Sequence, residues 1–269
     1  MDTRPIGVFD SGLGGLTTVK RLSELLPNED IIYLGDTGRV PYGSRSRDTI
    51  IKYSVQATEF LVKHDVKSMV IACNTASTSA HSILKSMNDI PIYEVVSAPA
   101  KAAALLSENR RVGVIGTTAT IGSGVYEAVI AEIAPDITVF SQACPLFVPL
   151  VENGRTDPED IAALTIAKDY LHILARHDID VLILGCTHYP LLRNVISCVI
   201  GNQIILIDSG AETAKHAADD MARIDILSSK TELGMIKYYV TDSIDGFSEL
   251  ASRFLESDVH GLVSQVTLE

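Results

Sequence analysis

The stretch "SMVIACNTAS", residues 68–77, decides how the chain is expected to fold. Its apolar run has the length of a buried strand, and Cys73, Asn74 and Thr75 follow that run at once. A strand that only fills a core does not need such an ending. Ligands of open parallel sheets bind just outside the carboxyl ends of the strands, so these three residues are candidates for a site.

Similar β-branched runs lie on both sides of this stretch. They occupy residues 6–12, 30–36 and 90–96, and segments with helical periodicity, such as 16–26 and 48–64, separate them. Alternation of strands and helices predicts an α/β fold with a mostly parallel sheet.

The second hundred residues repeat the first hundred. Gly7 and Gly113 occupy corresponding positions in the runs 6–12 and 111–117, and a His-Asp pair stands nine residues before both Cys73 and Cys186. This repeat predicts two similar lobes with mostly parallel sheets, each with a cysteine at the carboxyl end of its third strand and both facing one cleft. The second set of predicted strands lies at 111–117, 136–142, 180–188 and 202–210.

The repeat also suggests domain boundaries. The segment after residue 210 contains helix patterns at 211–224 and 245–255 and a strand pattern at 236–242, but no further strand that ends in a cysteine. We therefore expect it to fold back onto one lobe. The predicted lobes are 1–97 plus 211–269, and 98–210.

Composition excludes several classes of protein. The 269 residues are 46% hydrophobic, which suits a globular protein, and no apolar run approaches the ~18 residues that cross a membrane. Asp2, Arg4 and Pro5 stand where a signal peptide would be apolar, so we expect a soluble cytoplasmic protein. A net charge of −12 opposes binding to nucleic acid and to anionic membranes.

The four cysteines show no metal-binding spacing. They form no C-x-x-C pair and no Cys/His cluster at zinc-finger spacing, so we expect no metal site. Cys144 and Cys198 are expected to be small buried apolar residues. Cys73 and Cys186 differ from them, because polar residues follow each directly.

The glycine-rich motif "DSGLGGLT", residues 10–17, resembles a dinucleotide-binding turn but does not fit one. Thr17 stands where the third glycine is needed, and Asp10 at the strand end would repel a pyrophosphate. Two interpretations remain: Asp10 and Ser11 project into the cleft, or one of them caps the following helix.

Two further segments are candidates to line the site. Residues 35–46 form a long loop after a strand, in which Tyr42 either contacts a ligand or only packs. In "CTHYP", Thr187 and His188 follow Cys186, and the histidine can set the ionisation of the thiol or act as an acid itself, unless its role is structural.

Two thiols across one pocket favour a particular reaction. Nucleophilic catalysis needs one thiol, and a disulfide switch does not need polar residues around each. Removal of a proton from one face of a carbon and its return to the other face needs two acid/base groups, and a thiol with a pKa near 8.5 can be either. This pattern indicates racemisation, and no lysine at a strand end suggests pyridoxal chemistry.

Five ordered motifs resemble the glutamate racemases of the aspartate/glutamate racemase superfamily. The resemblance extends to the tail "YYVTDSIDGFSELASRFL" and so covers essentially the whole chain. The motifs are "GVFDSGLGGLT" (7–17), "YLGDTGRVPYG" (33–43), "ACNTAS" (72–77), "CPLFVPLVENG" (144–154) and "LGCTHYPLL" (184–192).

The resemblance implies cofactor-independent interconversion of L- and D-glutamate for peptidoglycan, in a cleft between two α/β lobes. Cys73 and Cys186 match the catalytic thiols, Asp10 the carboxylate that assists the first, and His188 the imidazole that assists the second. The positions that match substrate-binding residues are Asp10, Ser11, Tyr42, Gly43, Asn74, Thr75, Thr187 and His188, with Thr117, Thr120 and Glu152 at more peripheral positions.

Two alternatives stay open at this point. The chain could be an aspartate or hydantoin racemase of the same superfamily, or a two-lobed binding or redox-sensing protein without turnover. Glutamate is the expected small-molecule partner, and a homodimer is an open expectation, because members of the superfamily form dimers of several geometries.

Overall fold

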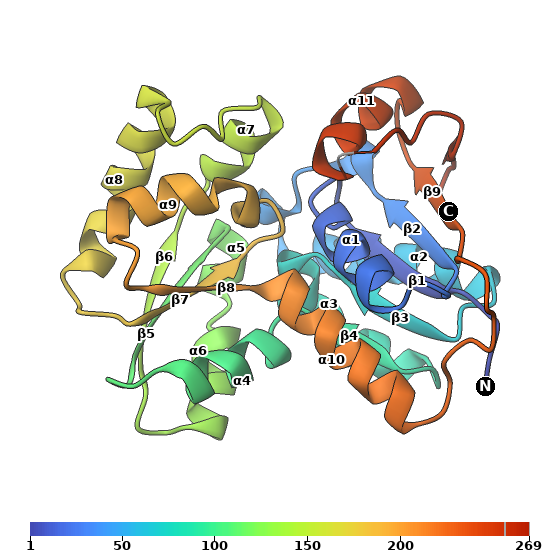
Figure 1. Ribbon diagram of the computed structural model, residues 1–269, viewed down its shortest axis with the longest axis horizontal. Coiled ribbons are helices and arrows are strands. Elements are labelled where there is room, and N and C mark those ends of the chain that lie inside the picture. The colour runs from blue at the N-terminus through green and yellow to red at the C-terminus, as the bar shows by residue number, and fades with distance from the viewer. Residues whose placement is uncertain (256, 269) are drawn as a thin grey trace.

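Two β-sheets, each built of parallel strands, lie side by side in the computed structural model, which describes residues 1–255 and 257–268 (Figure 1). The first sheet has six parallel strands in the spatial order β10-β9-β2-β1-β3-β4. We call it, with its helices, the first lobe. Its strands are β1 (Ile6–Asp10), β2 (Ile31–Gly35), β3 (Ser68–Ile71), β4 (Ile92–Glu94), β9 (Ile236–Val240) and β10 (Val263–Gln265).

The second lobe is built on four parallel strands in the order β6-β5-β7-β8. If β5 is matched to β1, this order is the order β2-β1-β3-β4 of the first sheet. The predicted α/β class with two pseudo-repeated lobes is therefore confirmed. The strands of the second sheet are β5 (Arg111–Gly116), β6 (Thr138–Ala143), β7 (Val181–Gly185) and β8 (Ile205–Asp208).

Helices cover both faces of the sheets. In the first lobe α1 packs against α10 and α2 against α3, and in the second lobe α8 packs against α9. Three short 3-10 turns, η1 (Thr37–Arg39), η2 (Tyr42–Ser44) and η3 (Tyr189–Leu192), lie after strand ends. The helices are α1 (Leu16–Leu25), α2 (Arg47–Lys63), α3 (Asn74–Met87), α4 (Ser97–Leu106), α5 (Thr118–Gly122), α6 (Val125–Ile133), α7 (Phe147–Glu152), α8 (Ile161–Ala175), α9 (Arg193–Ile200), α10 (Ser209–Arg223) and α11 (Ile244–Leu255).

The repeat extends to single residues in front of the third strand of each lobe. Asp65 (φ 54°) and Asp178 (φ 51°) both adopt the left-handed conformation, in which Asp is tolerated better than most residues. A Cβ atom on Gly113 would lie 2.6 Å from Cδ1 of Ile179, the residue after Asp178, and Gly7 faces Val66 in the same way. The repeated glycine leaves room for the side chain that follows the repeated turn.

The chain passes between the lobes twice. It crosses from β4 to α4, which packs on α6, β7 and β8, and it returns from β8 to α10, which packs on α1. Figure 1 shows the second crossing, where β8 runs directly into α10 at the junction of the lobes. The C-terminal segment then adds β9 beside β2 and β10 at the outer edge.

Some predicted boundaries were wrong. The strand expected at 90–96 is only three residues long, because the Glu94 carboxylate accepts hydrogen bonds from the N–H groups of Val96 (2.6 Å) and Ser97 (2.9 Å) and turns the chain.

Cys198 was expected to be buried and is exposed. The buried side chains of α9 are Val195, Ile196 and Ile200, so helical periodicity places Cys198 on the outer face.

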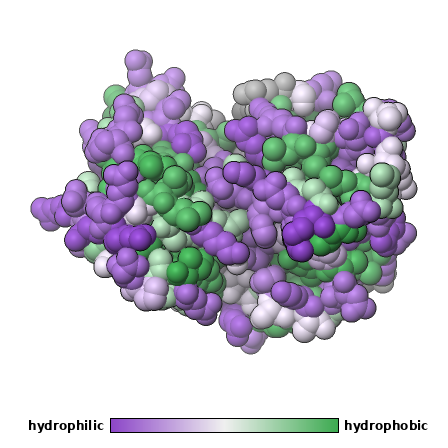
Figure 2. Space-filling model, turned by 60° about the horizontal axis from the view of Figure 1, so that its bottom comes forward, coloured by the Kyte–Doolittle hydropathy of each residue, from purple (hydrophilic) through white to green (hydrophobic). Residues whose placement is uncertain are grey.

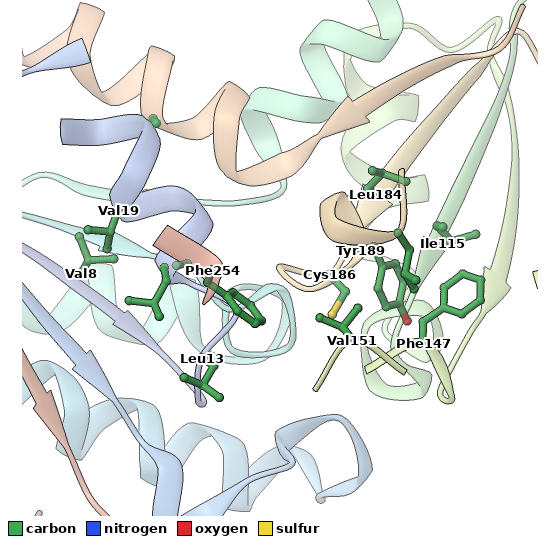
Figure 3. Close-up of a cluster of buried hydrophobic side chains, with 14 of the residues drawn as sticks. Val8, Leu13, Val19, Ile115, Phe147, Val151, Leu184, Cys186, Tyr189 and Phe254 are labelled. Carbon is green, nitrogen blue, oxygen red and sulfur yellow. The ribbon is translucent and has the colours of Figure 1, made fainter. Parts of the chain in front are cut away.

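One apolar cluster extends from the first lobe into the second. Figure 3 shows Leu13 and Phe254 of the first lobe opposite Cys186 and Val151 of the second. On the surface, Figure 2 shows apolar residues in separate patches between hydrophilic ones. No helix in the described part of the chain is long and apolar enough to cross a membrane.

Candidate active site

A cavity of about 250 Å³ lies between the lobes, where the carboxyl ends of the central strands of both sheets meet. Both predicted thiols, Cys73 and Cys186, border it. Other predicted residues on its wall are Ser11, Tyr42, Gly43, Asn74, Thr75, Thr117, Glu152, Thr187 and His188. The structure thus brings together residues from both halves of the sequence.

Cys73 stands between the end of β3 and the start of α3. Its Sγ accepts a hydrogen bond from the N–H of Ala76 (3.5 Å) and so caps the helix, and it donates to Oγ of Ser11 (3.4 Å). Burial raises the pKa of the Cys73 thiol to about 12, and the carboxylate of Asp10 acts in the same direction. At neutral pH Cys73 is a protonated thiol.

Asp10 lies beneath the glycine-rich turn, fully buried, and does not border the cavity, so its predicted projection into the cleft holds for Ser11 but not for Asp10. Its Oδ2 accepts a hydrogen bond from the N–H of Gly12 (2.9 Å), while Oδ1 has no partner among the described residues. Burial raises the pKa of Asp10, although the charge of His188 and the N–H groups of the turn act against this. The turn therefore holds a carboxylate of the chain itself where a dinucleotide-binding turn would hold a phosphate.

The alternative that Asp10 or Ser11 caps the next helix is wrong. The N-cap residue of α1 is Gly15, and no side chain caps this helix. A Cβ atom on Gly15 would lie 2.6 Å from Cβ of Asp10, so glycine is required for the turn to close over the carboxylate.

Cys186 has an imidazole as its neighbour. Its Sγ lies 4.0 Å from Nδ1 of His188, whose Nε2 lies 3.2 Å from Oε1 of Glu152. Burial alone would lower the pKa of His188, but hydrogen bonds to Cys186 and Glu152 outweigh it and raise the pKa to about 10. The imidazole is therefore protonated at neutral pH and places a positive charge beside the second thiol. Phe254 packs edge-on against its ring at 6.1 Å.

Three threonine hydroxyls meet at the junction of the lobes. Oγ1 of Thr75 lies 3.0 Å from Oγ1 of Thr117 and 3.3 Å from Oγ1 of Thr120, and the last two are 3.0 Å apart. A hydroxyl can donate and accept, so this cluster can turn its donors toward a carboxylate. Thr120 belongs to the cluster but is 1% exposed and does not border the cavity.

Asn74 borders the cavity, but its carboxamide is engaged elsewhere. Nδ2 lies 2.9 Å from Oη of Tyr126 and 3.2 Å from the carbonyl oxygen of Val95. Thr187, in contrast, lies against the glycine-rich turn, where a Cβ atom on Gly14 would lie 2.0 Å from its Oγ1. The glycine-rich turn of the first lobe therefore lies directly against the loop that follows Cys186.

The loop at 35–46 lines the cavity through Tyr42 and Gly43 and is anchored by Asp36. The carboxylate of Asp36 is fully buried and accepts hydrogen bonds from Tyr42 Oη, Arg39 Nε (2.7 Å) and Thr241 Oγ1 (2.9 Å). Asp36 was not among the predicted site residues, although an aspartate directly after a strand could have indicated it. The apolar wall of the cavity, formed by Pro145, Val148 and Pro149, was not predicted either.

Comparison with known proteins agrees with this geometry. A family model described as Asp/Glu/Hydantoin racemase matches residues 6–217. A glutamate racemase from Geobacter metallireducens is 46% identical over 269 residues, which is 100% of this chain and 98% of that protein. The chain belongs to the aspartate/glutamate racemase family.

Solved glutamate racemases share the fold over the full length. The crystal structure from Francisella tularensis, in complex with D-glutamate, has a TM-score of 0.93 and 38% identity, and covers 100% of this chain and 99% of that one. An isoform from Bacillus anthracis has a TM-score of 0.95 at 36% identity, with coverage of 100% and 99%.

Membership of this racemase family makes the chain an amino-acid racemase, an isomerase. The predicted glutamate racemase is confirmed over the aspartate and hydantoin alternatives and over the binding or redox-sensing protein, because the full-length relatives are named glutamate racemases.

Proposed function

We propose that the chain interconverts L- and D-glutamate with Cys73 and Cys186 as the two acid/base groups and without a cofactor. One observation carries the proposal: two thiols on equivalent strand ends border one cavity. Their hydrogen-bonding neighbours differ, Ser11 for Cys73 and His188 for Cys186. Two groups of one chemical type suit a reaction that must run in both directions at one carbon.

The two thiols have different neighbours, which suits them to opposite roles in one turnover. Cys73, with its raised pKa, is a thiol and serves as the acid. The imidazolium of His188 stabilises negative charge on Cys186, which serves as the base. The thiolate removes the α-proton from one face of glutamate, and the opposite thiol donates a proton to the other face. The reverse reaction exchanges the two roles.

The polar groups around the cavity suit a dicarboxylic amino acid. The hydroxyls of Thr75 and Thr117 at the junction, and that of Ser11 beside Cys73, can donate to carboxylate oxygens. Glu152, on the opposite lobe, offers a carboxylate that can attract the ammonium group. The apolar wall of Pro145, Val148 and Pro149 excludes water from the carbanion-like species.

The biological setting follows from the proposed reaction. We propose that the chain acts in the cytoplasm and supplies D-glutamate for peptidoglycan. We also propose the lobe boundaries 1–97 plus 211–269 and 98–210, and a homodimer as the assembly. Protease mapping of lobe boundaries and ultracentrifugation of the purified chain test the last two.

The deciding experiment follows the α-proton. Purified protein is incubated with D-glutamate in deuterated water without pyridoxal phosphate, and proton NMR and optical rotation are recorded. We expect loss of the α-proton together with conversion to L-glutamate. Folded protein that produces neither change would overturn the proposal, and faster turnover of aspartate would overturn the substrate assignment.

A further inference from the structure

A buried polar cluster joins the two lobes behind the cavity. It consists of the side chains of Asn74, Tyr126 and Ser209 and the carbonyl groups of Val95 and Leu184, and we call it the junction cluster. All five residues are at most 2% exposed. Burial of this many polar groups is unfavourable unless they bond to one another, which they do here.

The first link connects Cys73 to the second lobe. Asn74 is the residue after Cys73 and the first of α3, and its Nδ2 lies 2.9 Å from Oη of Tyr126 on α6. The same hydroxyl donates to the carbonyl oxygen of Val95 at 2.9 Å, in the first crossing between the lobes. One phenol oxygen therefore joins both lobes and the chain that connects them.

The second link reaches toward Cys186. Ser209 begins α10 at the return crossing, and its Oγ donates to the carbonyl oxygen of Leu184 at 2.9 Å. Leu184 lies in β7, two residues before Cys186. Nδ2 of Asn74 also lies 3.3 Å from Oγ of Ser209. A continuous chain of hydrogen bonds thus runs from the residue after one thiol to the strand that carries the other.

We propose that Tyr126 and Ser209 are positioning residues that, through Asn74, hold the two thiols at the separation and orientation that racemisation needs. The proposal rests on the two-thiol function given above. Neither Tyr126 nor Ser209 borders the cavity, so any effect on turnover passes through the junction cluster. Two thiols on different lobes must face one carbon from opposite sides, and small displacements of reacting groups lower rates strongly.

The principal test is Tyr126→Phe, which removes one oxygen and keeps the ring. Tyr93→Phe is the matched control, because Tyr93 is also buried and its hydroxyl donates to Asp220 at 3.0 Å, outside the junction cluster. We expect Tyr126→Phe to lower kcat for glutamate about tenfold with little change in KM, at a temperature where the variant is fully folded. Tyr93→Phe should keep the wild-type kcat.

A second readout separates positioning from simple loss of stability. In deuterated water a well-aligned pair gives deuterated product of inverted configuration. A displaced second thiol lets the first return a deuteron to the face from which the proton came. We expect Tyr126→Phe to raise the ratio of α-deuterated D-glutamate recovered to L-glutamate formed, and Tyr93→Phe to leave this ratio unchanged.

Ser209→Ala serves as the second variant and should shift kcat and the exchange ratio in the same direction. Wild-type kcat and exchange ratio in both Tyr126→Phe and Ser209→Ala would overturn the positioning role while leaving the proposed function intact. If the wild-type protein itself did not racemise glutamate, both proposals would fall together. A variant that does not fold is replaced by the other, whose result then decides.

Discussion

The ends of β3 and β7 occupy equivalent places in the two lobes, yet the chain leaves them differently. After Cys73 the helix α3 begins at once, and the thiol itself caps it. After Cys186 the η3 turn, which contains Pro190, comes before α9. The residues between strand and helix bring His188 next to the second thiol, and the first lobe has no counterpart.

The neighbouring strand differs as well. Asp10 ends β1, and the correspondence of Gly7 with Gly113 makes Gly116 its counterpart at the end of β5. The first thiol therefore has a carboxylate nearby and the second has an imidazolium. The duplicated fold provides the same thiol position twice, while the residues just beyond the strands decide the charge beside each thiol.

Replacement of a thiol should have the largest effect. Cys73→Ser and Cys186→Ser should each lower racemisation by at least ~10³-fold, because a serine hydroxyl is far too weak an acid to replace the thiol. Each variant keeps one thiol and should exchange the α-proton of only one enantiomer, a different one in each case. Deuterium exchange of D- and L-glutamate measures this.

Cys198→Ser, on the exposed face of α9, is the matched control and should keep full activity. Exchange of the same enantiomer by both thiol variants would contradict the assignment of one thiol to each face.

The opposite ends of the same two strands offer a comparison in stability. Lys67, just before β3, is fully buried, and its Nζ lies 2.5 Å from Oε2 of Glu29. Asp180, just before β7, accepts hydrogen bonds from Ser107 and from the N–H groups of Glu108 and Asn109 instead. We expect Lys67→Met to lower the free energy of unfolding by about 3–5 kcal/mol, because it leaves a buried charge unpaired.

Asp180→Asn should cost only about 1 kcal/mol, since its hydrogen bonds are partly exposed and its side-chain oxygen still accepts. Urea unfolding measures both values, and kcat at 25 °C should be unchanged in each variant. Equal losses in the two variants would show that the buried pair contributes no more than the exposed turn.

The Lys67–Glu29 pair could not be predicted from the sequence, whereas other features could. The strands, the repeat and both thiols followed from local patterns, since apolar runs and the polar residues that end them are adjacent in the chain. Lys67 and Glu29 are 38 residues apart, and Asn74 and Tyr126 are 52 apart. No local pattern indicates that such residues meet. The Lys67–Glu29 ion pair became visible only in the structure. The same is true of the hydrogen bond between the Asn74 carboxamide, predicted to bind substrate, and Tyr126.

The carboxylate beside the first thiol should act in a pH-dependent way. Asp10→Asn removes a negative charge that raises the pKa of Cys73, so this pKa should fall from about 12, and the alkaline limb of kcat against pH should move to lower pH. We expect kcat at pH 8 to fall about tenfold to a hundredfold, because proton transfer at Cys73 loses the carboxylate charge of Asp10 beside it.

Ser11→Ala tests the sign of this effect. The hydroxyl of Ser11, 3.4 Å from Cys73 Sγ, can rotate to donate a hydrogen bond to the thiolate, which lowers the pKa of Cys73. Its removal should therefore move the alkaline limb to higher pH. Shifts in the same direction for both variants would mean that Asp10 does not act through its charge.

The smallest effect is expected at the second thiol. Glu152→Gln removes one of the interactions that raise the pKa of His188 to about 10, so the imidazolium should lose its proton at lower pH and the alkaline limb should again move to lower pH. The Glu152 side chain is 38% exposed, so water and salt screen its charge, and we expect kcat to fall only about threefold.

The control is Glu132→Gln on the exposed surface of α6, which should leave kcat and its pH profile unchanged. Glu152→Gln should slow exchange in the enantiomer that Cys186 deprotonates, whereas Asp10→Asn should slow exchange in the other one. If both variants slowed the same enantiomer, the two charges would act on a shared step, and the division of roles between the lobes would be wrong. Opposite selectivity would instead tie each charge to its own thiol, because the two partners then influence different faces of the same carbon.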